Sequence, residues 1–152
     1  MKRIAIIILS IITVISISLA IYFYSQTPVS ISQYRVLTQA AELDALLSLK
    51  GTYPLLVDLR DNEDFDTAHI ANFLNFSFDD GGKRLATWIA PYKKDKPIIL
   101  ICYSGNRSAR AFELLVLMGF THITDFTSGY EAYAIEKGNS FTPEKGSCNC
   151  PK

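Results

Sequence analysis

The chain has 152 residues, of which 49% are hydrophobic and 20% are charged, so it is long enough for one domain with a buried core and too apolar for a disordered chain. Its formal net charge is zero, and without Lys2 and Arg3 the remainder carries 13 basic and 15 acidic residues. A mildly acidic domain lacks the basic face that nucleic acid requires, so we expect no nucleic-acid partner.

Residues 4–24 form an uncharged, mostly apolar stretch directly after the basic pair Lys2-Arg3. As a helix rising about 1.5 Å per residue, this stretch just crosses the hydrocarbon core of a membrane. Because basic residues stay on the cytoplasmic side, we expect residues 1–24 to anchor the chain in the cytoplasmic membrane, with the remainder on the periplasmic or cell-surface side. A signal peptide cleaved after Ala20 is the alternative, and it also exports the domain.

The rest of the chain divides into a linker at 25–33, a globular domain at 34–140 and a flexible Cys-containing tail at 141–152. Within the domain, short apolar runs alternate with segments of helical periodicity. The predicted strands are Leu55–Asp58, Phe73–Phe76, Pro97–Cys102 and His122–Phe126, and the predicted helices are Gln39–Leu49, Leu85–Ile89, Ser108–Met118 and Gly129–Lys137. This alternation predicts an α/β fold with a mainly parallel central sheet flanked by helices.

Cys102 ends the most apolar of these strands, and a short loop separates it from a helix that begins near Ser108. Gly105 allows a tight turn in which backbone amides point inward and form a nest for an anion. The helix N-terminus and Arg107 add positive charge, which lowers the pKa of a thiol below its free value of about 8.5. We therefore predict that Cys102 is a nucleophile in an anion-binding loop made of Tyr103, Ser104, Gly105, Asn106, Arg107 and Ser108. A buried structural thiol is the competing interpretation.

This loop resembles the Cys-x-x-Gly-x-Arg-Ser loop of the rhodanese family. Further family-like features follow the same order along the chain: Asp58-Leu59-Arg60, Phe65, His69-Ile70, Asn75, Gly119-Phe120 and Ser128-Gly129. The resemblance covers about residues 34–137 and implies a rhodanese-like three-layer domain, preceded here by the N-terminal hydrophobic helix. Departures from the family pattern are Asp64, Ala68, Ala71, Asn72, Ser128 and Tyr133. None of them lies in the cysteine loop, and Asn72 tolerates the left-handed backbone of a turn that the family usually makes with Gly.

The resemblance implies a sulfurtransferase that works by double displacement. The Cys102 thiolate would take the outer sulfur of a thiosulfate-like anion as a persulfide, and a thiol or cyanide-like acceptor would remove it, without a metal or organic cofactor. Six residues from Cys102 to Arg107 match the loop of sulfurtransferases, whereas the related phosphatases and arsenate reductases have one more. We expect Asp58 and Arg60 to form a structural ion pair, and His69 to be a hydrogen-bonded structural residue.

Two other functions remain open: a rhodanese-like module that binds a partner or presents sulfur without catalysis, and a thiol redox protein that uses Cys148 and Cys150. One of the three cysteines must stay unpaired within a monomer, and a Cys148–Cys150 bridge would close a tight ring. We therefore consider the hypothesis that a tail thiol resolves the Cys102 persulfide or forms a disulfide with Cys102. The sequence does not define the oligomeric state.

Overall fold

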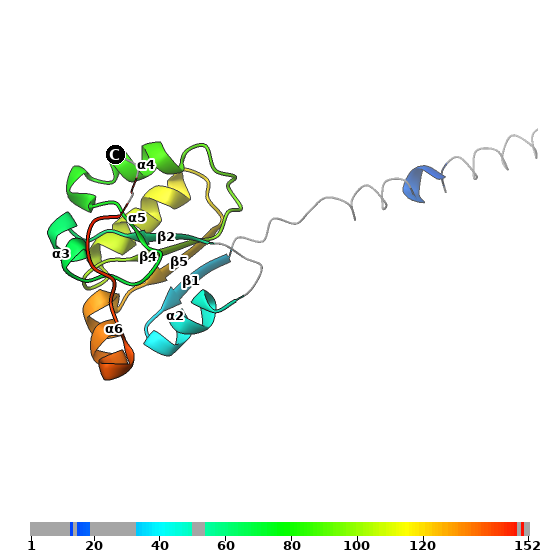
Figure 1. The fold of residues 1–152 in the computed structure, drawn as a ribbon. Coiled ribbons are helices and arrows are strands. Elements are labelled where there is room, and N and C mark those ends of the chain that lie inside the picture. The colour runs from blue at the N-terminus through cyan, green and yellow to red at the C-terminus, as the bar shows by residue number, and fades with distance from the viewer. Residues whose placement is uncertain (1–12, 14, 19–32, 50–53, 149, 151–152) are drawn as a thin grey trace, which may run out of the picture. The chain divides into compact units, whose positions relative to one another are not determined.

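The structure is a computed structural model, and it describes residues 13, 15–18, 33–49, 54–148 and 150 (Figure 1). The chain divides into two units, residues 1–31 and residues 32–152. In the first unit the described residues, 13 and 15–18, are helical. Within the described parts of the chain, no helix has both the length and the apolar character needed to span a membrane. Most of the predicted anchor at 4–24 lies outside the described residues.

The second unit contains a five-stranded parallel sheet in the order β1-β5-β4-β2-β3 (Figure 1). The strands are β1 (Gln33–Leu37), β2 (Leu55–Asp58), β3 (Leu74–Asn75), β4 (Ile98–Ile101) and β5 (His122–Phe126). The helices are α2 (Ala40–Leu47), α3 (Asn62–Thr67), α4 (Lys83–Ile89), α5 (Asn106–Leu117) and α6 (Gly129–Lys137), with short 3₁₀ turns η1 (Phe78–Asp80) and η2 (Gly138–Ser140). The predicted α/β fold with a mainly parallel sheet is confirmed.

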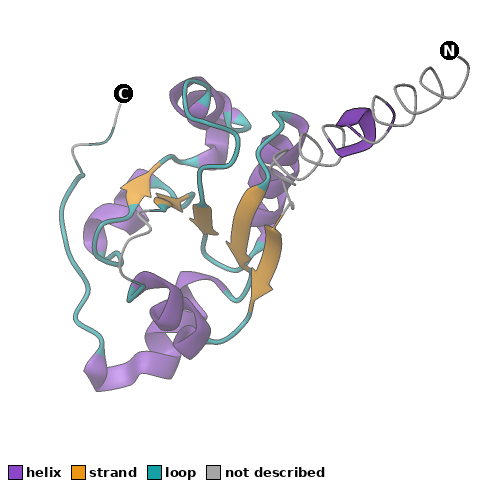
Figure 2. Ribbon diagram, turned by 90° about the vertical axis from the view of Figure 1, so that its right-hand side faces the viewer, coloured by secondary structure: helices purple, strands orange, loops and turns teal. Residues whose placement is uncertain are grey.

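Two hydrophobic clusters fill the space on the two faces of the sheet. On one face, Leu85 of α4 and Leu115 of α5 pack with Leu100 of β4. On the other face, Leu43 of α2, Phe65 of α3 and Tyr133 of α6 pack with Ile99 and Ile101. Strand β4 is buried along its whole length because both of its faces are covered, which explains its uninterrupted apolar sequence. Figures 1 and 2 show the resulting helix–sheet–helix layers.

Local side-chain chemistry sets several element boundaries. The Glu42 carboxylate accepts the backbone N–H groups of Thr38 and Gln39, each at 3.1 Å, and so closes the start of α2. Gly119 follows the end of α5 with φ +86°, and Asn72 adopts φ +67° in the turn before β3. The prediction that Asn72 takes a left-handed conformation is therefore confirmed.

One strand and one α-helix were not predicted. Strand β1 is exposed at four of its five positions and lies at the sheet edge, so its sequence lacks the apolar run of a central strand. Helix α3 is short and polar, and Phe65 is its only buried residue. Both elements depend on neighbours elsewhere in the chain, which hydrophobic periodicity does not reveal.

The segment predicted to be a flexible tail lies instead along the domain. Figure 2 shows it running from α6 as an extended loop. Glu144 and His69 exchange two backbone hydrogen bonds of 2.9 Å in an antiparallel bridge, and the Gly146 N–H donates to the Asp66 carbonyl at 2.7 Å. Phe141 and Cys148 pack against the hydrophobic cluster that contains Phe65 and Tyr133.

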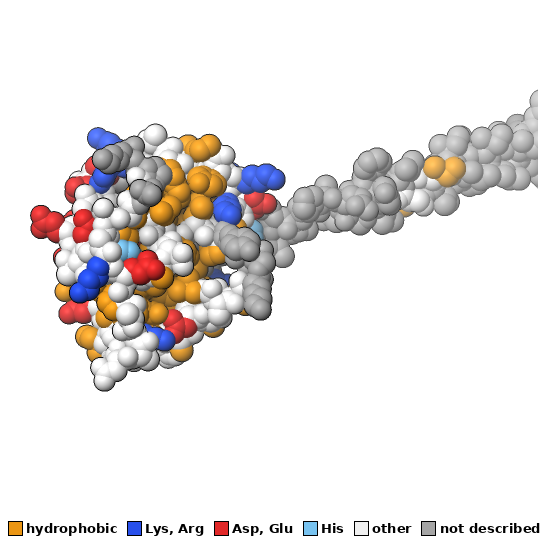
Figure 3. Space-filling view, in the orientation of Figure 1, with side chains coloured by type: hydrophobic (Ala, Val, Ile, Leu, Met, Phe, Trp, Pro, Cys, Tyr) orange, Lys and Arg blue, Asp and Glu red, His pale blue; other side chains and the backbone are white. Residues whose placement is uncertain are grey.

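On the face of the domain shown in Figure 3, apolar side chains gather near the centre and charged side chains of both signs surround them.

Candidate active site

Cys102 lies directly after β4, at the carboxyl end of the central strands. Parallel pairing aligns Asp58 of β2 with Ile101 of β4, and Ile101 with Phe126 of β5. The residues that follow these three strands consequently meet at one edge of the sheet, where open parallel sheets bind their ligands. The Cys102 side chain is buried, with 1% of its surface exposed.

The loop after Cys102 surrounds its sulfur with polar groups. The Gly105 N–H donates to Cys102 Sγ at 3.1 Å, and the Ser108 Oγ lies 3.7 Å from the same sulfur. The Ser108 hydroxyl donates to the Gly105 carbonyl at 3.0 Å, which holds the first turn of α5 against the loop. Helix α5 begins at Asn106, two residues before the predicted start, so its positive N-terminal end lies next to the sulfur.

Two glycines make this loop possible. Gly105 has φ +91°, and a Cβ atom there would collide with the carbonyl oxygen of Thr127. Gly129, the first residue of α6, has φ +78°, and a Cβ atom there would collide with the carbonyl oxygen of Tyr103. The next amide, Tyr130 N–H, donates to the Cys102 carbonyl at 2.8 Å. The backbone at the start of α6 thus packs directly against the cysteine loop and fixes its conformation.

A cavity of about 430 Å³ opens over Cys102, and we call it the cysteine pocket. The predicted loop residues Tyr103, Ser104, Asn106 and Arg107 line one side, whereas Gly105 and Ser108 lie buried beneath them. Asp61 and Asp64 complete its lining. Each predicted loop residue therefore either lines the pocket or supports its floor.

Arg107 forms an ion pair at the mouth of the cysteine pocket. Its guanidinium donates to the Asp61 carboxylate at 2.9 Å, and both side chains are partly exposed. Asp61 was not singled out from the sequence. Its position just after the predicted strand β2 could have identified it, because β2 and β4 are adjacent parallel strands and the loops that follow them meet at the same edge of the sheet.

The predicted ion pair of Asp58 and Arg60 is present and buried, with 2.7 Å between Asp58 Oδ2 and Arg60 Nη2. Arg60 also donates to the Ala68 carbonyl at 2.8 Å and lies 3.7 Å from the centre of the Tyr130 ring. Burial raises the pKa of the Asp58 carboxyl, and the hydrogen bonds and charge of Arg60 oppose that rise. Arg60 therefore links the end of α3 to the start of α6, on which the cysteine loop rests.

His69 does not line the cysteine pocket. Its ring stacks on Phe65 with 3.8 Å between ring centres, and Nδ1 lies 2.9 Å from the Phe65 carbonyl oxygen. Nε2 lies 3.6 Å from the Glu144 carboxylate of the C-terminal segment. These contacts place His69 between α3 and that segment.

Cys148 and Cys150 are bonded to each other as a disulfide, so the structure does not contain the hypothesised disulfide with Cys102. The Asn75 N–H, at the edge strand β3, lies 2.9 Å from Cys150 Sγ and 3.4 Å from Cys148 Sγ. The disulfide thus covers the Asn75 N–H on the outer side of edge strand β3, where no strand pairs with it in the described part of the chain. Among the described residues, no three His, Cys, Asp or Glu side chains gather in a group that could hold a metal ion.

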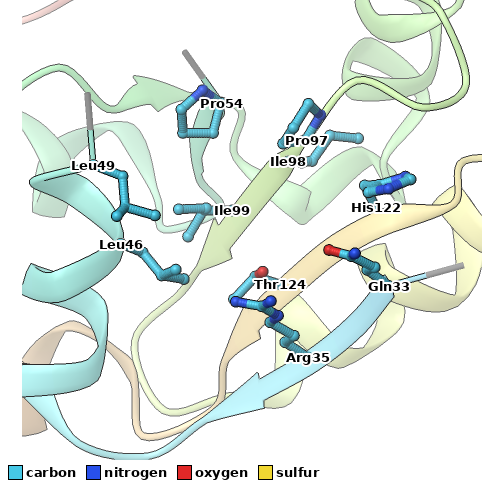
Figure 4. A pocket seen from close by; sticks show the side chains of 10 residues that line it. All are labelled: Gln33, Arg35, Leu46, Leu49, Pro54, Pro97, Ile98, Ile99, His122 and Thr124. Atoms are coloured by element: carbon cyan, nitrogen blue, oxygen red, sulfur yellow. The ribbon is translucent and has the colours of Figure 1, made fainter. Parts of the chain in front are cut away.

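A separate cavity lies at the opposite, amino-terminal ends of the strands (Figure 4). Apolar side chains such as Leu46 and Ile99 line one part of it, and Arg35 and Thr124 line another. Leu49 and Pro54 in its wall adjoin residues 50–53, which lie outside the described part of the chain. This cavity contains no part of the cysteine loop.

Asp125 of β5 is a buried carboxylate near Cys102 that was not predicted from the sequence. Only 3% of its surface is exposed, and its Oδ1 atom has no hydrogen-bond partner among the described residues. Burial raises the pKa of Asp125, and the neighbouring Ser108 hydroxyl works in the opposite direction. Ser108 Oγ in turn lies 3.7 Å from Cys102 Sγ, so Ser108 stands between Asp125 and Cys102.

Replacing Asp125 with Asn is expected to stabilise the domain at neutral pH by about 1 kcal/mol, because it removes a buried charge with an unsatisfied oxygen. A carboxyl whose pKa is raised in the folded state binds protons more tightly there, so its contribution to stability falls as pH rises from its ordinary pKa of 3.8 through the raised value. Urea unfolding of both proteins from about pH 4 to pH 8 measures the difference. A gain that does not grow with pH would contradict the explanation, and exposed Asp95→Asn is the control.

Comparisons with known proteins agree with this geometry. Residues 39–136 match the family model described as "Rhodanese-like domain". The chain is 33% identical over 86 residues to the thiosulfate sulfurtransferase GlpE of Pseudomonas savastanoi pv. phaseolicola, a match that covers 57% of this chain and 77% of the relative. It is 28% identical over 95 residues to the GlpE protein of Coxiella burnetii, covering 62% of this chain and 85% of that protein.

Solved structures show the same fold. A rhodanese-related protein from Thermoplasma volcanium is 30% identical with a TM-score of 0.54, over 69% of this chain and 94% of that one. A rhodanese-like domain protein from Staphylococcus aureus has a TM-score of 0.58 at 24% identity, over 74% of this chain and 99% of that one. The chain therefore belongs to the rhodanese-like domain family. Within that family, the similarity to curated sulfurtransferases identifies it as a sulfurtransferase.

Proposed function

We propose that the protein carries a sulfane sulfur on Cys102, taken from thiosulfate or a similar anion and passed to a thiol or cyanide-like acceptor. The observation that carries this proposal is the environment of Cys102 Sγ, which is buried, accepts the Gly105 N–H at 3.1 Å and lies at the N-terminus of α5. Backbone amides and a helix N-terminus stabilise a thiolate, and they stabilise the terminal sulfur of a persulfide in the same way.

The reaction has two displacements. The Cys102 thiolate attacks the outer sulfur of thiosulfate, a new S–S bond forms on Cys102, and sulfite leaves with the electron pair of the broken bond. An acceptor thiolate then attacks the outer sulfur of the persulfide, and the Cys102 thiolate leaves. Neither step requires an external oxidant or reductant. Arg107 is held by Asp61 at the mouth of the cysteine pocket, where its charge can contact the incoming anion.

We also propose that residues 4–24 anchor the chain in the cytoplasmic membrane and that the catalytic domain faces the periplasm or cell surface. The uncharged length of this stretch and the basic pair before it support the proposal. Intact mass of the protein isolated from membranes distinguishes an anchor from a cleaved signal peptide. Protease digestion of intact cells tests the side on which the domain lies, and a fully protected domain contradicts export.

The test of the function is the persulfide itself. The full-length chain in a non-ionic detergent is incubated with thiosulfate, and intact mass is expected to rise by about 32 Da, the mass of one sulfur atom on the thiol. Peptide mapping is expected to place the added sulfur on Cys102. Absence of the adduct, or its location on a tail cysteine, would overturn the proposed function.

A further inference from the structure

A second cavity, of about 460 Å³, adjoins the cysteine pocket. It lies between α3 and α6, and the two cavities share Asp64 and Tyr103 in their walls. Tyr130, Ala134 and Ile135 supply its apolar surface, and Ile135 is 73% exposed. We call this second cavity the acceptor groove, because a molecule bound in it would lie next to the outer sulfur of a persulfide on Cys102.

The acceptor groove is larger than a small acceptor needs. Pockets that hold drug-sized ligands have volumes of about 300–1,000 Å³, so a two-atom anion such as cyanide would leave it nearly empty. Its exposed apolar side chains, Ile135 and Tyr103 at 73% and 47%, are of the kind that bind side chains of a partner. The groove is thus suited to a peptide segment.

The charge of this region is negative. At the cysteine pocket the charge of Arg107 is balanced by Asp61, and in the wall of the acceptor groove the charge of Arg60 is balanced by Asp58. Asp64 and Glu131 also line the groove, and neither forms an ion pair with any residue in the part of the chain that the structure describes. Two unbalanced carboxylates therefore face a groove whose basic residues are already neutralised.

We propose that the acceptor groove binds the physiological sulfur acceptor, and that this acceptor is a cysteine-bearing segment of a partner protein with Lys or Arg next to its thiol. The inference rests on the proposed function, since it names the acceptor for the same Cys102 persulfide. Basic side chains complement Asp64 and Glu131, and they also lower the pKa of the neighbouring thiol, which raises the fraction of attacking thiolate. Small acidic thiols are disfavoured by the same two carboxylates.

The transfer step is balanced without a co-reactant. The partner thiolate attacks the outer sulfur of the Cys102 persulfide, an S–S bond forms on the partner and the S–S bond on Cys102 breaks. The electron pair of that bond returns to Cys102 Sγ, which the Gly105 N–H then stabilises at the position seen in the structure. The product is a persulfide on the partner segment.

The test uses the full-length chain in a non-ionic detergent, loaded with thiosulfate, freed of excess donor and checked for the added sulfur. Two short peptides that differ only in having Lys or Glu on both sides of one cysteine are the acceptors. Their initial rates of sulfur gain are compared by mass spectrometry at matched thiolate concentration, which removes the effect of peptide pKa. At low salt the Lys peptide is expected to react about tenfold faster, and the ratio is expected to shrink as salt rises.

Matched variants locate the source of the preference. Glu131→Gln removes a carboxylate that lines the acceptor groove but not the cysteine pocket. It is expected to lower the ratio of rates from about tenfold to about threefold while the protein still loads with sulfur. Glu113→Gln removes the same charge from an exposed position outside both cavities and is expected to keep the ratio.

The outcomes separate the two proposals. A chain that does not load with sulfur overturns the proposed function, and the acceptor assignment falls with it. A chain that loads but shows no preference for the Lys peptide overturns the acceptor assignment alone. A preference that is unchanged in Glu131→Gln, or that falls equally in Glu113→Gln, also overturns it.

Discussion

Cys102→Ser is expected to lower the rate of sulfur transfer from thiosulfate to cyanide about a thousandfold or more, because a serine hydroxyl is not ionised at neutral pH and forms no persulfide. Thiocyanate production by the full-length chain measures the rate. Fluorescence of Trp88, the only tryptophan, reports whether the variant remains folded, since its ring packs against Phe76 with 4.6 Å between ring centres.

The matched control is the double variant Cys148→Ser with Cys150→Ser, which removes the disulfide at β3 and leaves the cysteine loop intact. It is expected to keep the rate of the parent protein. If Cys102→Ser stays active, or if the tail variant loses activity as completely, then Cys102 is not the sulfur carrier that the pocket geometry suggests. The second result would favour a thiol redox protein that uses its tail.

Arg60→Met is expected to destabilise the domain by about 3–5 kcal/mol, because it leaves Asp58 as an unpaired buried charge. The variant also removes the hydrogen bond to the Ala68 carbonyl and the contact with the Tyr130 ring. Urea unfolding followed by Trp88 fluorescence measures the loss of stability. Because Tyr130 N–H supports the Cys102 carbonyl, a loss of sulfur-transfer activity is expected in the same variant.

Two comparisons separate the buried pair from a general effect of removing an arginine. Arg84→Met breaks only exposed ion pairs with Asp79 and Asp80 and is expected to cost less than about 1 kcal/mol. Adding Asp58→Asn to Arg60→Met removes the unpaired buried charge. The Asn side chain still accepts a hydrogen bond from the backbone N–H of residue 60, so part of the lost stability is expected to be recovered. Equal losses for Arg60→Met and Arg84→Met would contradict this account.

The order of the elements was predictable because their patterns are local. Strands at Leu55–Asp58 and His122–Phe126 and the helix at Gly129–Lys137 were predicted with the bounds that the structure has. Each is a run whose hydrophobic period or flanking glycine is contained within a few neighbouring residues. Edge strand β1 and the polar helix α3 were missed, because they are stabilised by pairing with β5 and by burial of one side chain, Phe65.

The packing of the tail against the domain was not predicted, for a related physical reason. Its Pro, Gly and Lys residues are typical of a flexible terminus, and the sequence does not show the two backbone bonds that Glu144 exchanges with His69. Backbone hydrogen bonds depend on which segments lie side by side, and side-chain composition carries little information about them.

The sequence by itself determined the candidate reactive group: a cysteine at the end of an apolar strand, Gly105 in the following loop, and a helix start after it. That information is local, because a strand, a tight turn and a helix N-terminus are set by consecutive residues. Only the tertiary structure decided what surrounds the group: Asp61 on Arg107, Gly129 beneath Tyr103, Asp125 behind Ser108, and the acidic groove between α3 and α6. These neighbours come from separate βα units that parallel pairing brings to one edge of the sheet, at distances along the chain that no local pattern spans.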